Sequence, residues 1–172
     1  LPCRPGQPLK IDYKYERMGV VDVFMIFEPL GGRRETLVTK TRTSIDFANV
    51  LKHVSDVMYP FAEKIVLVTD NLNTHKAGAL YLAFCAEEAH RLLNRFEWHY
   101  TPNYGSWLDM VEVEIGVMCR VALGVVFADM ESFVRQVKAW TQQRNVQCAK
   151  VNWQFTTKDA RIKLKRLHPT IL

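Results

Sequence analysis

The chain has 172 residues, of which 48% are hydrophobic, so it can bury one sizeable core, and its length favours a single domain. No apolar run approaches the roughly 18 residues that a membrane-spanning helix needs, so we expect a soluble, cytoplasmic protein. The four cysteines form no C-x-x-C pair, which argues against a zinc ribbon or a thioredoxin-type site.

Positive charge is concentrated at the C-terminal end. The formal net charge is +5, but residues 138–172 contain eight basic residues against Asp159, a formal +7. The rest of the chain is therefore slightly acidic, at −2. A basic end on a near-neutral body indicates a polyanionic partner for that end.

An antiparallel hairpin is predicted near the start of the chain. Residues 20–27 are rich in β-branched and aromatic side chains, and residues 28–32 are turn-forming. Residues 35–41 then alternate polar and apolar side chains, as a half-buried strand does.

A helix and a buried strand are predicted next. Ser44 or Asp46 can cap a helix that Pro60 stops, because apolar side chains recur between them at helical spacing. Residues 64–69 are almost wholly apolar, which is typical of a strand buried on both faces of a sheet. This strand ends directly at Asp70.

The second half alternates helices with one more strand. We expect a helix over residues 76–96, a strand over 97–101 and a helix from Ser106 onward. A further helix is expected over residues 129–140, and the segment 152–157 leads into a basic tail helix. This order predicts an α/β fold, with a mixed sheet flanked by helices.

Asp70 is the first candidate for chemistry. Ligands of open α/β sheets bind outside the carboxyl ends of the strands, where a carboxylate can hold a hard divalent cation. The alternative is that Asp70, Asn71 and Asn73 only terminate the strand and cap the following helix. The pattern alone favours this structural interpretation.

Glu112 is the second candidate, because it lies one turn into a helix that opens after a Pro-Asn-Tyr-Gly-Ser loop. Asp109 and Glu112 share a helix face, whereas Glu114 lies nearly opposite Glu112. Metal-assisted phosphoryl chemistry needs two or three carboxylates around the cations. The alternative for Glu112 is an ordinary solvated helix charge.

Several blocks, in order along most of the chain, resemble one protein family. They are DNLNTH (70–75), HYTPNYGSWLDMVEVE (99–114), NWQFTTKDARIKLKRLHP (152–169) and DYKYERMGVVDVFMIFEPLGGRR (12–34). These blocks resemble the DDE transposases of mariner-like bacterial insertion sequences. The resemblance implies a ribonuclease-H-like catalytic domain over residues 1–172, with a basic C-terminal tail over about 141–172.

The resemblance also implies a reaction. An Asp, Asp and Asp-or-Glu triad binds Mg²⁺ or Mn²⁺, and the enzyme cuts the transposon ends and joins them to target DNA. Carried over by position, the second carboxylate is Asp70 and the third is Glu112. Both would be catalytic and metal-binding residues of a bacterial, nucleoid-associated enzyme.

The first aspartate of the family lies on an initial strand upstream of the Pro5-Gly6 segment. We therefore expect this sequence to lack that strand and its aspartate, which puts the activity of the chain in doubt. Asp12 and Asp22 are the nearby acids, but they match other positions of the family pattern. An unpaired sheet edge would favour a homo-oligomer.

Three further residues near the motifs are of interest. Asp109 stands where the family usually has Asn, and Tyr104 stands where His is common. Asp109 would add a negative charge beside the metal site and change a carboxylate pKa there. His75 either contacts a phosphate or orients Asp70, or it is bonded locally in the first turn of a helix.

The basic tail is expected to contact DNA phosphates rather than read bases. Its candidate residues are Lys158, Arg161, Lys163, Lys165 and Arg166. A second group of residues could interleave aromatic and cationic side chains on DNA: Trp140, Arg144, Asn145, Trp153 and Phe155. The favoured interpretation is that the aromatics among them are buried and hold the tail onto the core. The rival function is a non-catalytic basic DNA-binding or interaction fragment derived from a transposase.

Overall fold

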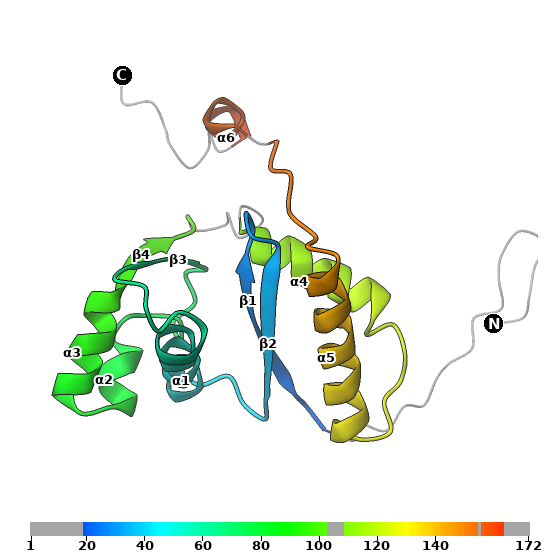
Figure 1. Cartoon of the computed structure of the whole chain (residues 1–172), viewed down its shortest axis with the longest axis horizontal. Helices are drawn as coiled ribbons and strands as arrows, with labels where there is room; N and C mark the ends of the chain where they lie inside the picture. Colours follow the sequence, from blue (N-terminus) through cyan, green and yellow to red (C-terminus); the bar gives the residue numbers. More distant parts are fainter. Residues whose placement is uncertain (1–18, 103–108, 155, 164–172) are drawn as a thin grey trace, which may run out of the picture.

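A central hairpin organises the fold in the computed structural model, which describes residues 19–102, 109–154 and 156–163. Strand β1 (Asp22–Glu28) pairs with β2 (Arg33–Thr39) in antiparallel register, from Asp22↔Thr39 to Glu28↔Arg33. Figure 1 shows this hairpin between two groups of helices. The predicted hairpin is confirmed, with its second strand beginning two residues earlier than expected.

The turn of the hairpin requires glycine at Gly32. Its φ is +69°, and its N–H donates to the Glu28 carbonyl oxygen at 2.8 Å. A Cβ atom at this position would lie 2.7 Å from the carbonyl oxygen of Cys148. Glycine therefore serves both the left-handed backbone and the close approach of a distant segment.

Helix α1 (Ser44–His53) follows the hairpin. Its N-cap is Thr43, whose side chain accepts from the Asp46 N–H while the Asp46 side chain accepts from the Thr43 N–H. The prediction that Ser44 or Asp46 is the cap was therefore wrong by a few residues, because Asp46 completes a capping box instead. The helix continues as a π-helical turn, η1 (Val54–Met58), and ends before Pro60 as expected.

Strands β3 (Ile65–Thr69) and β4 (Phe96–Tyr100) pair in parallel, from Ile65↔Phe96 to Thr69↔Tyr100. Two short helices connect them, α2 (Ala79–Ala83) and α3 (Ala86–Arg95). The single helix predicted over residues 76–96 was wrong. Phe84 and Cys85 have extended backbone, and this break turns Phe84 against the core.

Strand β3 is buried on one face only. Ile65 and Leu67 pack against the core, but Val66 and Val68 are 64% and 54% exposed. The expectation of a strand buried on both faces was therefore wrong for the described residues. An apolar run records hydrophobic residue types, and it does not reveal whether helices cover each face.

Helices cover both faces of the hairpin. Phe24 and Ile26 of β1 join a core with α1, α2, α3 and the β3–β4 pair. Val23 and Met25, on the other face, pack with α4 (Met110–Val121) and α5 (Met130–Val146). This alternation explains why both faces of β1 are apolar.

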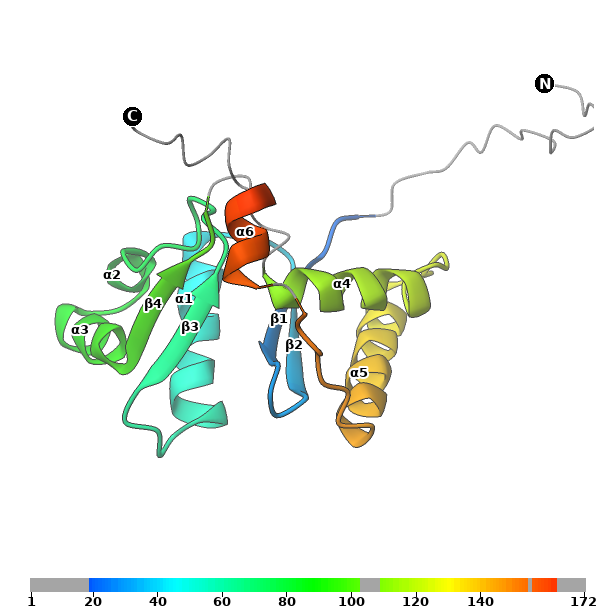
Figure 2. The same ribbon diagram turned by 90° about the horizontal axis from the view of Figure 1, so that it is seen from above.

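The predicted mixed α/β architecture is confirmed, but the strands do not form one continuous sheet. Among the described residues, β1 pairs with β2 and β3 pairs with β4, in two separate two-stranded sheets. Figure 2 shows the β3–β4 pair beside the hairpin, with α1 behind β3. The short tail helix α6 (Thr157–Lys163) lies beyond the beginning of α4.

Within the described ranges, no helix combines the length and apolar character needed to cross a membrane.

Candidate active site

Asp70 lies at the carboxyl end of β3, where the sequence placed it. The Thr101 N–H donates to the Thr69 carbonyl oxygen at 3.0 Å, which holds the end of β3 against the end of β4. The Asp70 side chain remains 31% exposed. Its Oδ1 atom accepts from the Leu72 N–H at 3.3 Å and lies 2.6 Å from Nδ1 of His75.

His75 is packed between the loop after β3 and the core. Its ring stacks on Phe47 of α1, with centroids 4.6 Å apart and planes at 26°. It also lies 6.1 Å from the ring of Phe24 in β1. The residue is therefore not only a local partner in a helix turn, because it joins Asp70 to two other elements of the fold.

Asp109 begins α4 and is almost fully buried. Its side chain accepts from the Val111 N–H at 3.2 Å, so it is the N-cap of the helix. The pKa of Asp109 is raised to about 6, mainly by burial and also by the negative charges of Asp70 and Glu112, against the lowering effect of the Val111 N–H. Asp70 and Glu112 therefore each act electrostatically on Asp109.

Glu112 is the third residue of α4 and is exposed to solvent. Its N–H donates to the Asp109 carbonyl oxygen at 3.1 Å, in the first turn of the helix. Asp70 and Glu112, two candidates from distant parts of the sequence, thus both act electrostatically on the same buried carboxyl group. A shared negative field of this kind attracts divalent cations.

Glu114 has a different environment, and it holds α4 in place. Its side chain is buried, with Oε1 3.0 Å from Nε of Arg34 and 2.9 Å from Nε of Arg144. Nη2 of Arg144 also donates to Oε2 at 3.0 Å. The sequence did not point to this network, because no pattern marks Arg34, next to a turn, as a buried residue.

Asn71 and Lys76 flank Asp70. The Lys76 ammonium donates to the Asn71 side-chain oxygen and lies 4.7 Å from the centroid of the Tyr100 ring. Asn71 therefore takes part in a polar contact at the end of the strand pair.

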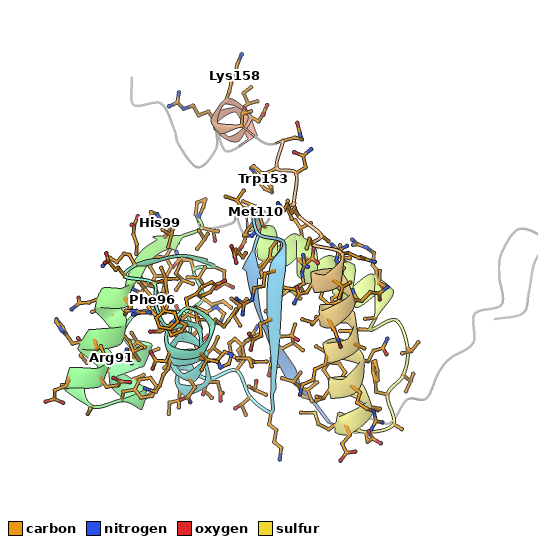
Figure 3. All side chains as sticks on the ribbon, in the orientation of Figure 1. Arg91, Phe96, His99, Met110, Trp153 and Lys158 are labelled. Carbon is orange, nitrogen blue, oxygen red and sulfur yellow. The ribbon has the colours of Figure 1, made fainter. Side chains whose placement is uncertain are left out.

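The other sequence candidates lie elsewhere. Asp22 begins β1, at the end of the hairpin opposite the turn, 4.0 Å from Nε of Arg42. Asp12 and Tyr104 lie outside the described residues. Lys158 and Arg161 on α6 are exposed, whereas the side chain of Lys163 and residues Lys165 and Arg166 are not among those described. Figure 3 shows Lys158 pointing away from the body of the protein.

The aromatic and polar residues before the tail have structural roles. Trp140 is buried between α5 and the hairpin. Arg144 pairs with Glu114, and the Asn145 side chain accepts from the Arg34 N–H at 2.8 Å. The burial of Trp140 agrees with the expectation of buried aromatics in this region. Trp153 is 36% exposed, and Phe155 lies outside the described residues.

The donor chemistry of the site suits a hard cation, because carboxylate oxygens are the preferred protein ligands of Mg²⁺ and Mn²⁺. Asp70 and Glu112 would hold it. Among the described residues, however, no group of three or more His, Cys, Asp or Glu side chains is arranged to hold a metal ion. A complete site of the two-metal type thus requires at least one more ligand.

Comparison with known proteins gives the family. A profile described as DDE superfamily endonuclease matches residues 2–133, which contain Asp70, Asp109 and Glu112. The chain belongs to the DDE superfamily endonuclease family. No curated protein and no solved structure showed a significant match.

Membership of the DDE superfamily endonuclease family has three consequences. The family implies a ribonuclease-H-like fold, with which the observed mixture of strands and helices agrees. It implies DNA as the macromolecule on which the domain acts. It also implies divalent metal ions, which agrees with the carboxylate chemistry at the ends of β3 and β4.

Proposed function

We propose that the chain is the catalytic domain of a transposase from a mariner-like bacterial insertion sequence. It would cut DNA strands at the transposon ends and transfer them to target DNA. The observation that carries the proposal is that Asp70, at the end of β3, and Glu112, in the first turn of α4, both act electrostatically on the buried Asp109. Family membership supplies the reaction class.

Asp70 and Glu112 are the proposed catalytic residues and metal ligands. When bound, Mg²⁺ or Mn²⁺ would activate the attacking water or hydroxyl and stabilise the leaving oxygen of the phosphodiester. The protein would hold both carboxylates in place, Asp70 through β3 and Glu112 through the buried Glu114 network. Lys76, beside Tyr100, would bind a DNA phosphate near the scissile bond.

We further propose that the ribonuclease-H-like sheet is completed by a strand between β1 and β3. Two observations support this: each of these strands has a single partner among the described residues, and both contribute side chains to the core that α1 also joins. Such a strand would carry the first aspartate of the family triad.

The basic tail is proposed to contact DNA. Lys158 and Arg161 are exposed on α6. Figures 1 and 2 show α6 on the same side of the molecule as the beginning of α4. A duplex whose backbone follows the tail would therefore reach the carboxylates without a large rearrangement. Lys163, Lys165 and Arg166 would extend the same phosphate contacts.

The test is nicking of supercoiled plasmid by the chain in Mn²⁺ and in Mg²⁺. Metal-dependent nicking that Asp70→Ala and Glu112→Ala each abolish would support catalysis at a site that this chain assembles. Glu131→Ala is the matched control, because Glu131 is an exposed first-turn carboxylate of α5. Salt-sensitive DNA binding without nicking would contradict catalysis by this chain and would favour the non-catalytic DNA-binding fragment.

A further inference from the structure

The His75 ring packs against two aromatic rings of the core. It stacks on Phe47 at 4.6 Å, lies 6.1 Å from the Phe24 ring and is only 13% exposed. Phe24 and Phe47 are themselves buried in the main core. A ring held in this way cannot rotate freely, so its two nitrogen atoms have defined directions.

One nitrogen of this ring contacts a candidate metal ligand. Nδ1 of His75 lies 2.6 Å from Oδ1 of Asp70, and the Leu72 N–H lies 3.3 Å from the same oxygen. Among the described residues, both hydrogen bonds to the Asp70 carboxylate therefore fall on Oδ1. These two contacts hold the Asp70 carboxylate through Oδ1, which leaves Oδ2 available to bind a metal ion.

The second nitrogen distinguishes His75 from ordinary histidine–carboxylate pairs. Nε2 of His75 is buried and has no hydrogen-bond partner among the described residues. Burial of an unpartnered polar atom destabilises a fold, and an N–H donor without an acceptor is such an atom. The neutral ring with its proton on Nδ1 satisfies this geometry best, because Nδ1 then donates to Asp70 and no N–H group is buried without an acceptor.

A similar pair elsewhere in the fold provides a comparison. Nε2 of His53 lies 2.5 Å from Oε1 of Glu35, with the two side chains 28% and 32% exposed. That pair joins α1 to β2 and is remote in sequence from the candidate ligands. Pairing with a carboxylate is therefore not unique to His75. What distinguishes His75 is its burial and its position beside Asp70.

We propose that His75 is a positioning residue, which orients the Asp70 carboxylate for metal binding by donating from Nδ1 to Oδ1. The inference rests on the proposed function, because it takes Asp70 as a metal ligand. Hydrogen bonds of this kind fix a ligand before the metal arrives, and their removal typically weakens metal affinity 10–100-fold. Phe24 and Phe47 would restrict the motion of the His75 ring and so help to keep the Asp70 carboxylate in one orientation.

Two substitutions separate the hydrogen bond from the packing. His75→Phe keeps an aromatic ring against Phe47 but removes the donor, whereas His75→Asn keeps a donor close to the position of Nδ1. His53→Phe is the matched control, since it removes the His53–Glu35 pair. The dissociation constant of Mn²⁺ is measured for each variant, with the melting temperature in EDTA as the measure of folding.

We expect His75→Phe to weaken Mn²⁺ binding by about 10–100-fold, and His75→Asn to restore most of that loss. His53→Phe should leave Mn²⁺ binding unchanged. Equal Mn²⁺ affinity of wild type and a folded His75→Phe variant would overturn the proposal. Failure of a folded His75→Asn variant to bind better than His75→Phe would overturn it as well.

Nitrogen-15 NMR of the histidine rings in the metal-free protein gives a readout that needs neither a variant nor activity. The proposal predicts the Nδ1–H tautomer for His75; the Nε2–H tautomer would overturn it, because Nδ1 could not then donate.

Asp70→Ala separates this inference from the function. If Asp70→Ala leaves Mn²⁺ affinity unchanged, the proposed metal site is wrong and the inference falls with it. If Asp70→Ala weakens binding but His75→Phe does not, only the positioning role is wrong.

Discussion

Glu112 and Glu114 lie two residues apart in α4 and have opposite environments. Glu114 is buried against Arg34 and Arg144, whereas Glu112 is exposed and acts electrostatically on Asp109. Because successive helix positions are about 100° apart, two residues of separation turn the side chains to nearly opposite faces. The helix therefore uses one carboxylate for its own attachment and presents the other to the site.

Substitution of the two glutamates should separate stability from function. Glu114→Gln should lower the free energy of unfolding by about 3 kcal/mol, because it leaves the buried Arg34 without its counter-charge. Glu112→Gln should change it by less than about 0.5 kcal/mol, as exposed substitutions usually do. Urea denaturation of both variants measures the difference. An equal or larger effect of Glu112→Gln would show that the assignment of the two faces is wrong.

Asp109 should make the metal-free protein less stable as the pH rises. Its pKa is raised to about 6 in the folded state, above the ordinary value near 3.9, by burial first and then by Asp70 and Glu112. The folded state therefore binds more protons than the unfolded state between these two values. The contribution of Asp109 to the free energy of unfolding is therefore most favourable below about pH 4, and this contribution is lost as the pH rises toward 6.

Asp109→Asn should remove this dependence. The amide oxygen of Asn can still accept from the Val111 N–H, so the helix cap is kept. In EDTA we expect the variant to gain about 2 kcal/mol of stability at pH 7 and little at pH 4. Urea denaturation across this pH range measures the gain. A constant difference between variant and wild type at all pH values would contradict the raised pKa.

The tail should act through phosphate contacts. If Lys158 and Arg161 each neutralise one phosphate, alanine at either position should reduce the slope of log binding constant against log salt concentration by about 1. The loss should be similar for unrelated duplex sequences. Lys40→Ala is the control, because Lys40 is exposed just after β2, at the end of the hairpin opposite its turn. A slope change for Lys40→Ala as large as for the tail variants would argue against a localised tail contact.

The exposed face of β3 gives a prediction about the fold. Val66→Thr and Val68→Thr should each alter the stability of this chain by less than about 0.5 kcal/mol, because both side chains are largely exposed. Leu51→Ala, in the core beneath, should lower it by about 2–5 kcal/mol. Thermal denaturation distinguishes the two cases. A large loss for Val66→Thr would show that this face is covered in solution.

The sequence was informative wherever local chemistry decides the structure. The hairpin, strand β3 and its terminal Asp70 follow from β-branched runs bounded by turn residues. The opposite faces of Glu112 and Glu114 follow from helical spacing alone. The break at Phe84 did not follow, because residues 76–96 keep a helical pattern and tertiary packing of Phe84 decides the outcome.

Long-range neighbours were the part that the sequence could not give. Nothing in the pattern joins His75 to Phe47, or Arg34 to Glu114, since these pairs depend on how distant elements pack. The cover of a strand face is equally a property of the whole fold, as Val66 and Val68 show. Site residues could be proposed by motif, but their mutual placement required the structure.

A double-mutant cycle on Mn²⁺ affinity tests the central claim most directly, that Asp70 and Glu112 hold one cation. The dissociation constant is measured for wild type, Asp70→Ala, Glu112→Ala and the double variant, with melting temperatures in EDTA to confirm folding. We predict that each single substitution weakens binding and that the second adds much less than it does alone, because the two carboxylates share one ion. Unchanged affinity in either single variant, or fully additive losses, would contradict a shared site.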